Sequence, residues 1–297
     1  MTRRATHRLA WPHLTLLVAL SLGRTGHVRA EPAHAPQVTV YIVDSGVRVS
    51  HRAVGQRTKP GGASAGRDFV HDAWGRTRGA DDCEGHGTAL ASLVRQPSAE
   101  GRGIRMFPVR VADCDGSSSP SRVLAALAWI ARWGRRPALV LASLDVGDSA
   151  LVRTAAEQLV ARGIAVVAAA GNTVADACLT APGGAPSVIT VASVRADGRA
   201  ATFSNLGPCI DLFAAGEELT VASIASDRAM RVRSGSSFAA ALVAGALARE
   251  LVQHPGASPS ELLLGLLALS RPSVQLSEQS AQLGTTRLRW RPRERSE

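Results

Sequence analysis

The sequence predicts an α/β domain in which helices cover both faces of a mostly parallel β-sheet. Apolar runs rich in β-branched residues, typical of buried strands, alternate along the chain with helical segments of about ten to fifteen residues. No linker rich in Pro, Gly and Ser divides the body of the chain, so we expect one domain. The composition agrees, because 45% of the residues are hydrophobic and 28 are glycine.

The predicted strands are short apolar runs with many Val, Ile, Leu and Ala residues. They cover residues 37–43, 104–112, 139–144, 164–170 and 187–194. The first run ends at Asp44, which puts an acid at the carboxyl end of a buried strand. Residues 52–82 are irregular and rich in Gly, Arg and Asp, so we expect a loop with at most a short strand there.

Capping residues and apolar segments predict the helices. They cover residues 89–94, 121–133, 149–162, the Ala-rich segment from Ser237 to Pro255, and 262–269. Ser121 is expected to cap the second of these helices, which Gly134 ends. Before the last one, Ser258-Pro259-Ser260-Glu261 combines a cap, a proline at the first helical position and a glutamate three residues after the cap.

The first 30 residues have the layout of a secretory signal peptide. Three arginines precede the apolar run 9–22, and Val28-Arg29-Ala30 offers a cleavage site, with an uncleaved anchor as the alternative. We therefore assign 1–30 to the signal peptide, 31–272 to the folded domain and 273–297 to an Arg-rich tail. The expected location is secreted or periplasmic.

The net charge of +10 comes mainly from the two ends of the chain. The first 30 residues hold five arginines and no acid, and residues 287–297 hold five arginines and two acids, so the body between carries about +2. We therefore expect no nucleic-acid partner, and no stable membrane contact unless the signal segment remains as an anchor. The expected state is a monomer.

Three residue types in a particular order predict nucleophilic catalysis. Asp44 follows a strand, His86 lies between two glycines at a helix start, and Ser237 lies in a helix's first turn. A serine hydroxyl becomes a nucleophile when an imidazole takes its proton, and a carboxylate orients that imidazole. Asn172, after another strand, could donate its amide to an oxyanion together with the Ser237 N–H. Taken singly, each residue could also be an ordinary cap or turn residue.

The residues that flank these four carry a family resemblance. The segments are Val43-Asp44-Ser45-Gly46, Gly85-His86-Gly87-Thr88, Ala168-Ala169-Ala170-Gly171-Asn172 and Ser234-Gly235-Ser236-Ser237-Phe238-Ala239. In this order they resemble the signature segments of the subtilisin-like serine peptidases, and the proteinase K-like branch is nearest. Phe203-Ser204-Asn205-Leu206-Gly207 and Asp211-Leu212-Phe213-Ala214 also match, so the resemblance covers about Val38 to His254.

The resemblance implies a doubly wound, seven-stranded sheet and endopeptidase activity on polypeptides through an acyl-enzyme. It implies that Ser237 is the nucleophile, His86 the general base and then acid, Asp44 its orienting group, and Asn172 the oxyanion donor.

The resemblance also suggests where a peptide substrate would bind. Residues Leu144, Asp145, Val146 and Gly147 resemble one edge of the cleft, and Ser117, Ser118 and Ser119 the other. Acids at Asp145 and Asp148 replace the family's usual Ser and Gly, so they could favour basic substrate side chains. We state this preference as a hypothesis; the alternative is two solvated loop acids.

Four cysteines after a signal-like segment predict disulfides, and sequence alone allows three pairings. The resemblance implies the pairs Cys83–Cys114 and Cys178–Cys209. We expect no metal or other cofactor. Structural calcium remains an alternative, because Asp81 and Asp82 lie on a loop that could hold it.

Several residues depart from the family pattern. Ala89 replaces a His after Gly-His-Gly-Thr, Ala215 replaces a Pro, and Ala241-Leu242 replace a Pro-His pair. The chain between Ala30 and Asp44 is also too short for a pro-segment, so the protein folds unaided, uses a partner, or is degenerate. The alternative function is therefore a non-catalytic relative that keeps the fold as a binding or scaffold module.

Overall fold

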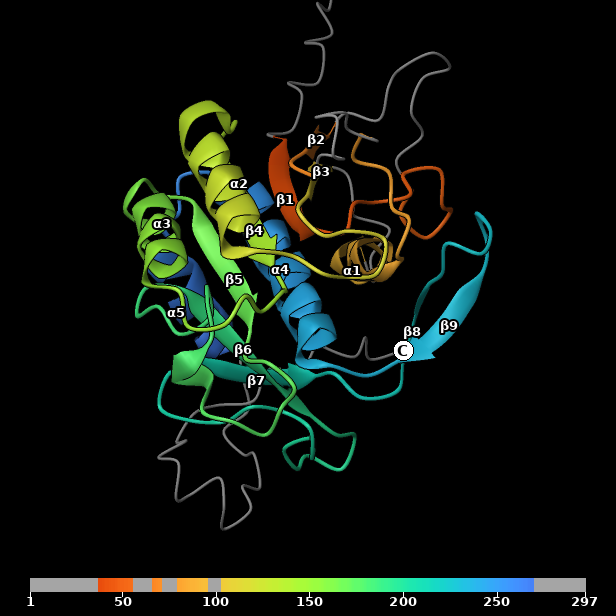
Figure 1. The fold of residues 1–297 in the computed structure, drawn as a ribbon. Coiled ribbons are helices and arrows are strands. Elements are labelled where there is room, and N and C mark those ends of the chain that lie inside the picture. The colour runs from red at the N-terminus through yellow and green to blue at the C-terminus, as the bar shows by residue number, and fades with distance from the viewer. Residues whose placement is uncertain (1–36, 56–65, 71–78, 96–102, 270–297) are drawn as a thin grey trace, which may run out of the picture. The chain divides into compact units, whose positions relative to one another are not determined.

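The computed structural model describes residues 37–55, 66–70, 79–95 and 103–269 (Figure 1). The predicted signal peptide (1–30) and Arg-rich tail (273–297) lie outside the described residues. No helix among the described residues is long and apolar enough to cross a bilayer.

A seven-stranded sheet forms the centre of the fold, and every neighbouring pair of its strands is parallel. The strands are β1 (Val38–Asp44), β2 (Arg67–Asp68), β3 (Ile104–Arg110), β4 (Ala138–Ala142), β5 (Ala165–Ala169), β6 (Ile189–Val194) and β7 (Leu212–Ala215). Their order in the sheet is β2-β3-β1-β4-β5-β6-β7, so the chain extends the sheet from β1 in both directions. Ligands bind outside the carboxyl ends of parallel strands where the order reverses in this way. Asp44 ends β1 and therefore lies at that place.

Helices cover both faces of this sheet (Figure 1). They are α1 (His86–Arg95), α2 (Pro120–Trp133), α3 (Ala150–Ala161), α4 (Ser236–Gln253) and α5 (Pro259–Ala268), with a short 3₁₀ helix at Ala177–Leu179. Val38, Val40 and Ile42 of β1 pack on the side of α1, α4 and α5, and Tyr41 and Val43 on the side of α2 and α3. Because both faces of β1 are covered, all seven of its residues are buried and its sequence is a nearly continuous apolar run.

The predicted fold class is confirmed, and the predicted strands and helices agree with the structure to within a few residues at most ends. One cap was predicted wrongly: the hydroxyl of Ser119, and not of Ser121, accepts the Arg122 N–H at the start of α2. Pro120 occupies the first helical position, where its fixed φ and missing N–H cost nothing, so the helix begins earlier than expected. The capping box of Ser258 and Glu261 is present as predicted.

Three short strands were not predicted. They are β7 and the two strands of an antiparallel hairpin, β8 (Leu219–Ala222) and β9 (Met230–Arg233). Each contains four residues, and β9 is largely exposed, so neither length nor apolar pattern marks them in the sequence. These strands form because the tertiary fold brings each one beside its partner, β7 beside β6 and β8 beside β9.

Both disulfides that the resemblance implied are present, Cys83–Cys114 and Cys178–Cys209. The partners are 31 residues apart in each pair, and closing a loop of that length stabilises the fold by about 3–4 kcal/mol in the chain-entropy model. The first bond joins the loop before α1 to the segment after β3. It therefore connects the loop that leads to His86 with the segment that leads to the predicted cleft residues 117–119.

Candidate active site

Asp44 and His86 form a hydrogen-bonded pair at the carboxyl end of β1. The imidazole Nδ1 lies 2.9 Å from Asp44 Oδ1 and 3.0 Å from Oδ2. The carboxylate is buried and also accepts the Ser45 N–H at 2.8 Å, which fixes its orientation. Gly87 allows this approach, because a Cβ at that residue would clash with the carbonyl oxygen of Gly46. With Nδ1 bound to Asp44, Nε2 is the ring nitrogen that can accept a proton.

The surroundings raise the pKa of His86 above its ordinary value. Burial of the ring lowers the pKa, but the negative charge of Asp44, its hydrogen bond to the ring and the charges of Glu84 and Asp82 together outweigh that effect. The imidazolium that forms when His86 takes a proton is therefore stabilised in this site.

Asp82 organises the loop that leads into α1, a role that sequence reasoning missed. Its Oδ1 accepts hydrogen bonds from Ser45 Oγ at 2.9 Å and from the N–H groups of Glu84 and Gly85 at 3.1 and 2.7 Å. Its Oδ2 is bound to Thr88. Both oxygens of Asp82 thus accept hydrogen bonds from the protein, which fixes the loop before α1.

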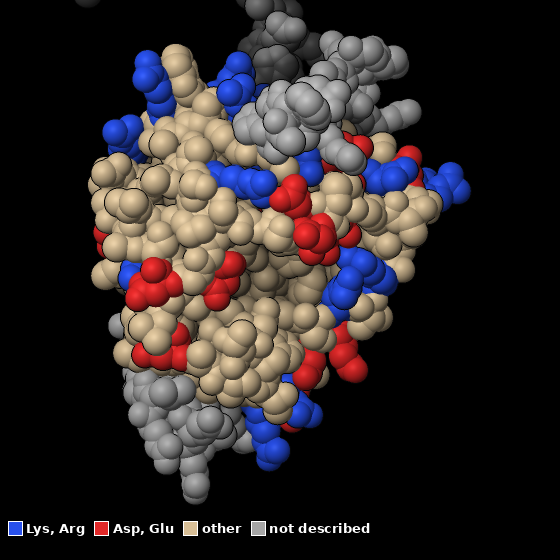
Figure 2. Space-filling view, in the orientation of Figure 1, with Lys and Arg blue, Asp and Glu red and all other residues tan. Residues whose placement is uncertain are grey.

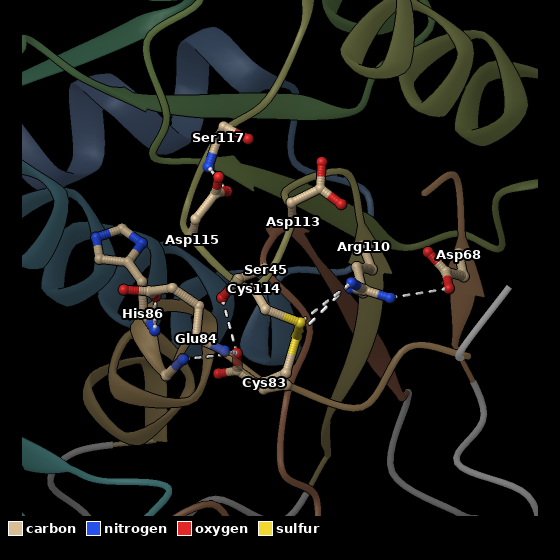
Figure 3. The surroundings of a disulfide bond; sticks show 12 residues. Ser45, Asp68, Cys83, Glu84, His86, Arg110, Asp113, Cys114, Asp115 and Ser117 are labelled. Atoms are coloured by element: carbon tan, nitrogen blue, oxygen red, sulfur yellow. Dashed lines mark hydrogen bonds and ion pairs between the residues drawn. A yellow bond between two sulfur atoms is a disulfide. The ribbon is translucent and has the colours of Figure 1, made fainter. Parts of the chain in front are cut away.

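A buried arginine lies on the far side of the first disulfide. Figure 3 shows Glu84 and His86 on one side of Cys83–Cys114, and Arg110 with Asp68 on the other. The Arg110 guanidinium is 3.2 Å from Asp68 Oδ2 and 3.6 Å from the Cys83 sulfur. The disulfide is therefore packed between the loop of His86 and the carboxyl end of β3.

Ser237 lies in the first turn of α4, as predicted, but its hydroxyl is not bound to His86. It donates to the carbonyl oxygen of Ser143 at 3.0 Å, and no hydrogen bond joins it to His86 within the part of the chain that the structure describes. The next residue, Phe238, contacts the imidazole with a ring-centroid distance of 5.5 Å. The start of α4 is therefore beside His86, with the serine hydroxyl turned toward the segment after β4.

Asn172 is held against the start of α4. Its Oδ1 accepts the Ser236 N–H at 2.8 Å, which leaves the Nδ2 hydrogens available. The Ser236 hydroxyl donates to the carbonyl oxygen of Gly171 and accepts the Gly171 N–H, both at 3.1 Å. The Ser237 N–H has no hydrogen-bond partner among the described residues. Asn172 Nδ2 and the Ser237 N–H are therefore both available as donors, and the segments that carry them are in contact. An oxyanion site requires such a pair of donors.

The two predicted edges of the substrate cleft leave the sheet on either side of β1. Residues 117–119 come after β3, and residues 144–147 come after β4. The space-filling view shows a hollow in this face with acidic side chains at its borders (Figure 2). Of the two acids proposed to select basic substrates, Asp148 forms an ion pair with Arg153, so only Asp145, which is exposed, could serve.

Comparison with known proteins shows what this chain resembles. The sequence profile of the subtilase family matches residues 35–281. An extracellular serine proteinase of Thermus sp. (strain Rt41A) is 37% identical over 238 residues, which are 80% of this chain and 56% of the relative. The alkaline serine exoprotease A of Vibrio alginolyticus is 34% identical over 239 residues, 80% of this chain and 42% of the relative.

One solved structure agrees with these sequences. The crystal structure of a cold-adapted subtilisin-like serine proteinase matches with a TM-score of 0.72 and 30% identity, covering 86% of this chain and 89% of that one. The chain spans about half or less of the length of the curated relatives it matches. The predicted family and fold are thereby confirmed.

Proposed function

The chain belongs to the subtilase family, and on this basis we propose that it is a serine endopeptidase whose triad is Asp44, His86 and Ser237. The observation that carries the proposal is the Asp44–His86 pair, in which one carboxylate contacts Nδ1 with both oxygens. The Asp44–His86 pair lies beside the first turn of α4. The unpaired N–H groups at the start of a helix favour developing negative charge.

The proposed reaction starts with rotation of the Ser237 side chain from Ser143 toward His86. His86 Nε2 takes the hydroxyl proton while Oγ attacks the peptide carbonyl, and Asp44 stabilises the resulting imidazolium. Asn172 Nδ2 and the Ser237 N–H hold the oxyanion. His86 then protonates the leaving amine, the acyl-enzyme forms, and water releases the second product by the same steps in reverse.

The proposed substrate is an extended polypeptide held between residues 117–119 and 144–147. Main-chain hydrogen bonds to two edges recognise such a chain, and pockets between them read its side chains. We also propose that the protein is exported. The Thermus relative is named extracellular, and two disulfides persist best in an oxidising compartment.

One observation favours the alternative of a non-catalytic binding module: the Ser237 hydroxyl is bonded to Ser143 rather than to His86. In the absence of substrate, however, catalytic hydrogen bonds are often not yet formed. The two functions differ in whether Ser237 reacts.

Fluorophosphonate labelling of the folded protein tests the proposal. The probe is expected to label the wild-type chain, and to label neither Ser237→Ala nor His86→Ala. Ser260→Ala, which changes an exposed serine on α5, is the matched control and should label like the wild type. A folded wild-type protein that does not react would support the binding module and end the peptidase proposal.

A further inference from the structure

The buried side chain of Asn205 contacts the loop that follows Asn172. Its Oδ1 accepts hydrogen bonds from the Thr173 N–H at 2.8 Å, the Thr173 hydroxyl at 3.1 Å and the Ala175 N–H at 3.0 Å. Its backbone N–H donates to the carbonyl oxygen of Gly171 at 2.9 Å. A single residue thus binds the chain both before and after Asn172.

The loop contains a backbone conformation that needs such support. Val174 has a φ of 58°, in the left-handed region that β-branched residues rarely adopt. Residues in such conformations persist only where the surrounding structure enforces them, and they gather at functional sites. Here the residues on either side of Val174 are the two whose N–H groups Asn205 binds.

The amide nitrogen of Asn205, Nδ2, indicates that the side chain serves to accept hydrogen bonds and not to donate them. Nδ2 is buried without a hydrogen-bond partner in the described residues, which is unfavourable for stability. It also lies against Gly171, where it leaves no room for a Cβ. The contacts of Oδ1 are therefore what this residue contributes to the loop.

We propose that Asn205 is a positioning residue for oxyanion stabilisation. It holds residues 173–175 in the strained conformation that places Asn172, while Ser236 holds Asn172 Oδ1 from the side of α4. The inference rests on the proposed function, because it acts through the donor assigned to Asn172.

Steady-state kinetics on peptide substrates test the inference first. Asn205→Ala is expected to lower kcat about tenfold or more with KM changed less than about twofold, because a misplaced donor affects the transition state and not substrate binding. In the Asn172→Ala background the same change should have almost no further effect on kcat. Additive losses would show that Asn205 does not act through Asn172.

The strained residue provides a rescue experiment with a matched control. Val174→Gly in the Asn205→Ala background should recover much of the lost kcat, since glycine adopts a positive φ without strain. Val174→Ala removes nearly the same side chain but keeps the unfavourable φ, so it should recover nothing. Equal recovery by both, or by neither, would contradict the proposed role.

Two further variants separate positioning from a general loss of structure. Asn205→Asp keeps the acceptor oxygen, but it also puts a negative charge at a buried position. It should therefore fold with lower stability and still keep a higher kcat than Asn205→Ala, because the contacts to Thr173 and Ala175 remain. Ser193→Ala removes another buried polar atom that lacks a partner among the described residues, and it should leave kcat unchanged. If Asn205→Ala does not fold, a folded Asn205→Asp whose kcat is as low as that of Asn172→Ala overturns the inference.

Hydrogen exchange gives a readout that does not depend on activity. Protection of the Thr173 and Ala175 amides should fall in Asn205→Ala, and remain in Ser193→Ala. Unchanged protection would overturn the inference. A wild-type chain that fails to label with fluorophosphonate would instead overturn the proposed function, so the two failures are distinguishable.

Discussion

The carboxylate of Asp82 accepts both the N–H and the hydroxyl of Thr88, at 2.9 and 2.6 Å. Thr88 lies in the first turn of α1, two residues after His86, so the contact ties the loop to the helix that carries the imidazole. The Thr88 hydroxyl oxygen in turn accepts the Arg48 N–H at 2.9 Å. The geometry of His86 therefore depends on an acid that takes no direct part in the proposed chemistry.

Asp82→Asn should lower the free energy of unfolding by about 2–4 kcal/mol. The substitution puts an amide NH₂ or a neutral oxygen where buried N–H and O–H groups now donate to a carboxylate, and leaves some of them unsatisfied. Denaturant unfolding measures the effect. Asp81→Asn, at the exposed neighbouring acid, is the control and should change stability by no more than about 0.5 kcal/mol. Equal stability of the two variants would contradict the role given to Asp82.

Asn172→Ala should lower kcat with little change in KM. In subtilisin itself, the loss of one oxyanion donor costs about 100- to 1000-fold in turnover, and we expect a loss of the same order here by analogy with that enzyme. Peptide hydrolysis under saturating substrate measures the loss. Turnover near that of the wild type would remove Asn172 from the oxyanion site.

The pH dependence of kcat/KM should report the raised pKa of His86. The base must be neutral, so activity should fall as the pH drops through this raised pKa, at a higher pH than for an ordinary histidine. The sign for stability is the opposite: protonated His86 stabilises the fold below the ordinary pKa, and this contribution is lost as the pH rises through the raised one.

In Asp44→Asn the negative charge that raises the His86 pKa is gone, so the acid limb of the profile should move to lower pH. Turnover should also fall by about 10⁴-fold, as for the same change in other triads. A profile whose acid limb does not move between the two proteins would show that Asp44 does not set the His86 pKa.

We expect the protein to cleave peptide substrates with basic side chains modestly faster, and we expect this preference to depend on Asp145 and not on Asp148. Asp145 is exposed, so its attraction for an arginine is expected to be worth about two- to fivefold in kcat/KM over a matched leucine peptide. Asp145→Asn should abolish the preference, while Asp148→Asn, whose carboxylate is already paired with Arg153, should keep it. Equal cleavage of arginine and leucine peptides by the wild-type protein would refute the hypothesis.

The fold class, most of the helices and strands, and the four residues proposed for catalysis could all be predicted from the sequence. Strands such as β1 and caps such as Ser258 are set by residues close together in the chain, so their patterns are local and visible. The family segments around Asp44, His86, Asn172 and Ser237 identified the candidates by type and order.

How those residues are held became clear only from the folded chain. The contacts of Asp82, the choice of Ser143 as partner of the Ser237 hydroxyl, and the support of Val174 by Asn205 all join segments from different parts of the chain. A hydrogen bond between residues 94 positions apart leaves no periodic signal in the sequence, because it depends on where the sheet places both ends. The same physical reason hides the β8–β9 hairpin, whose strands are too short to be recognised until the rest of the fold brings them together.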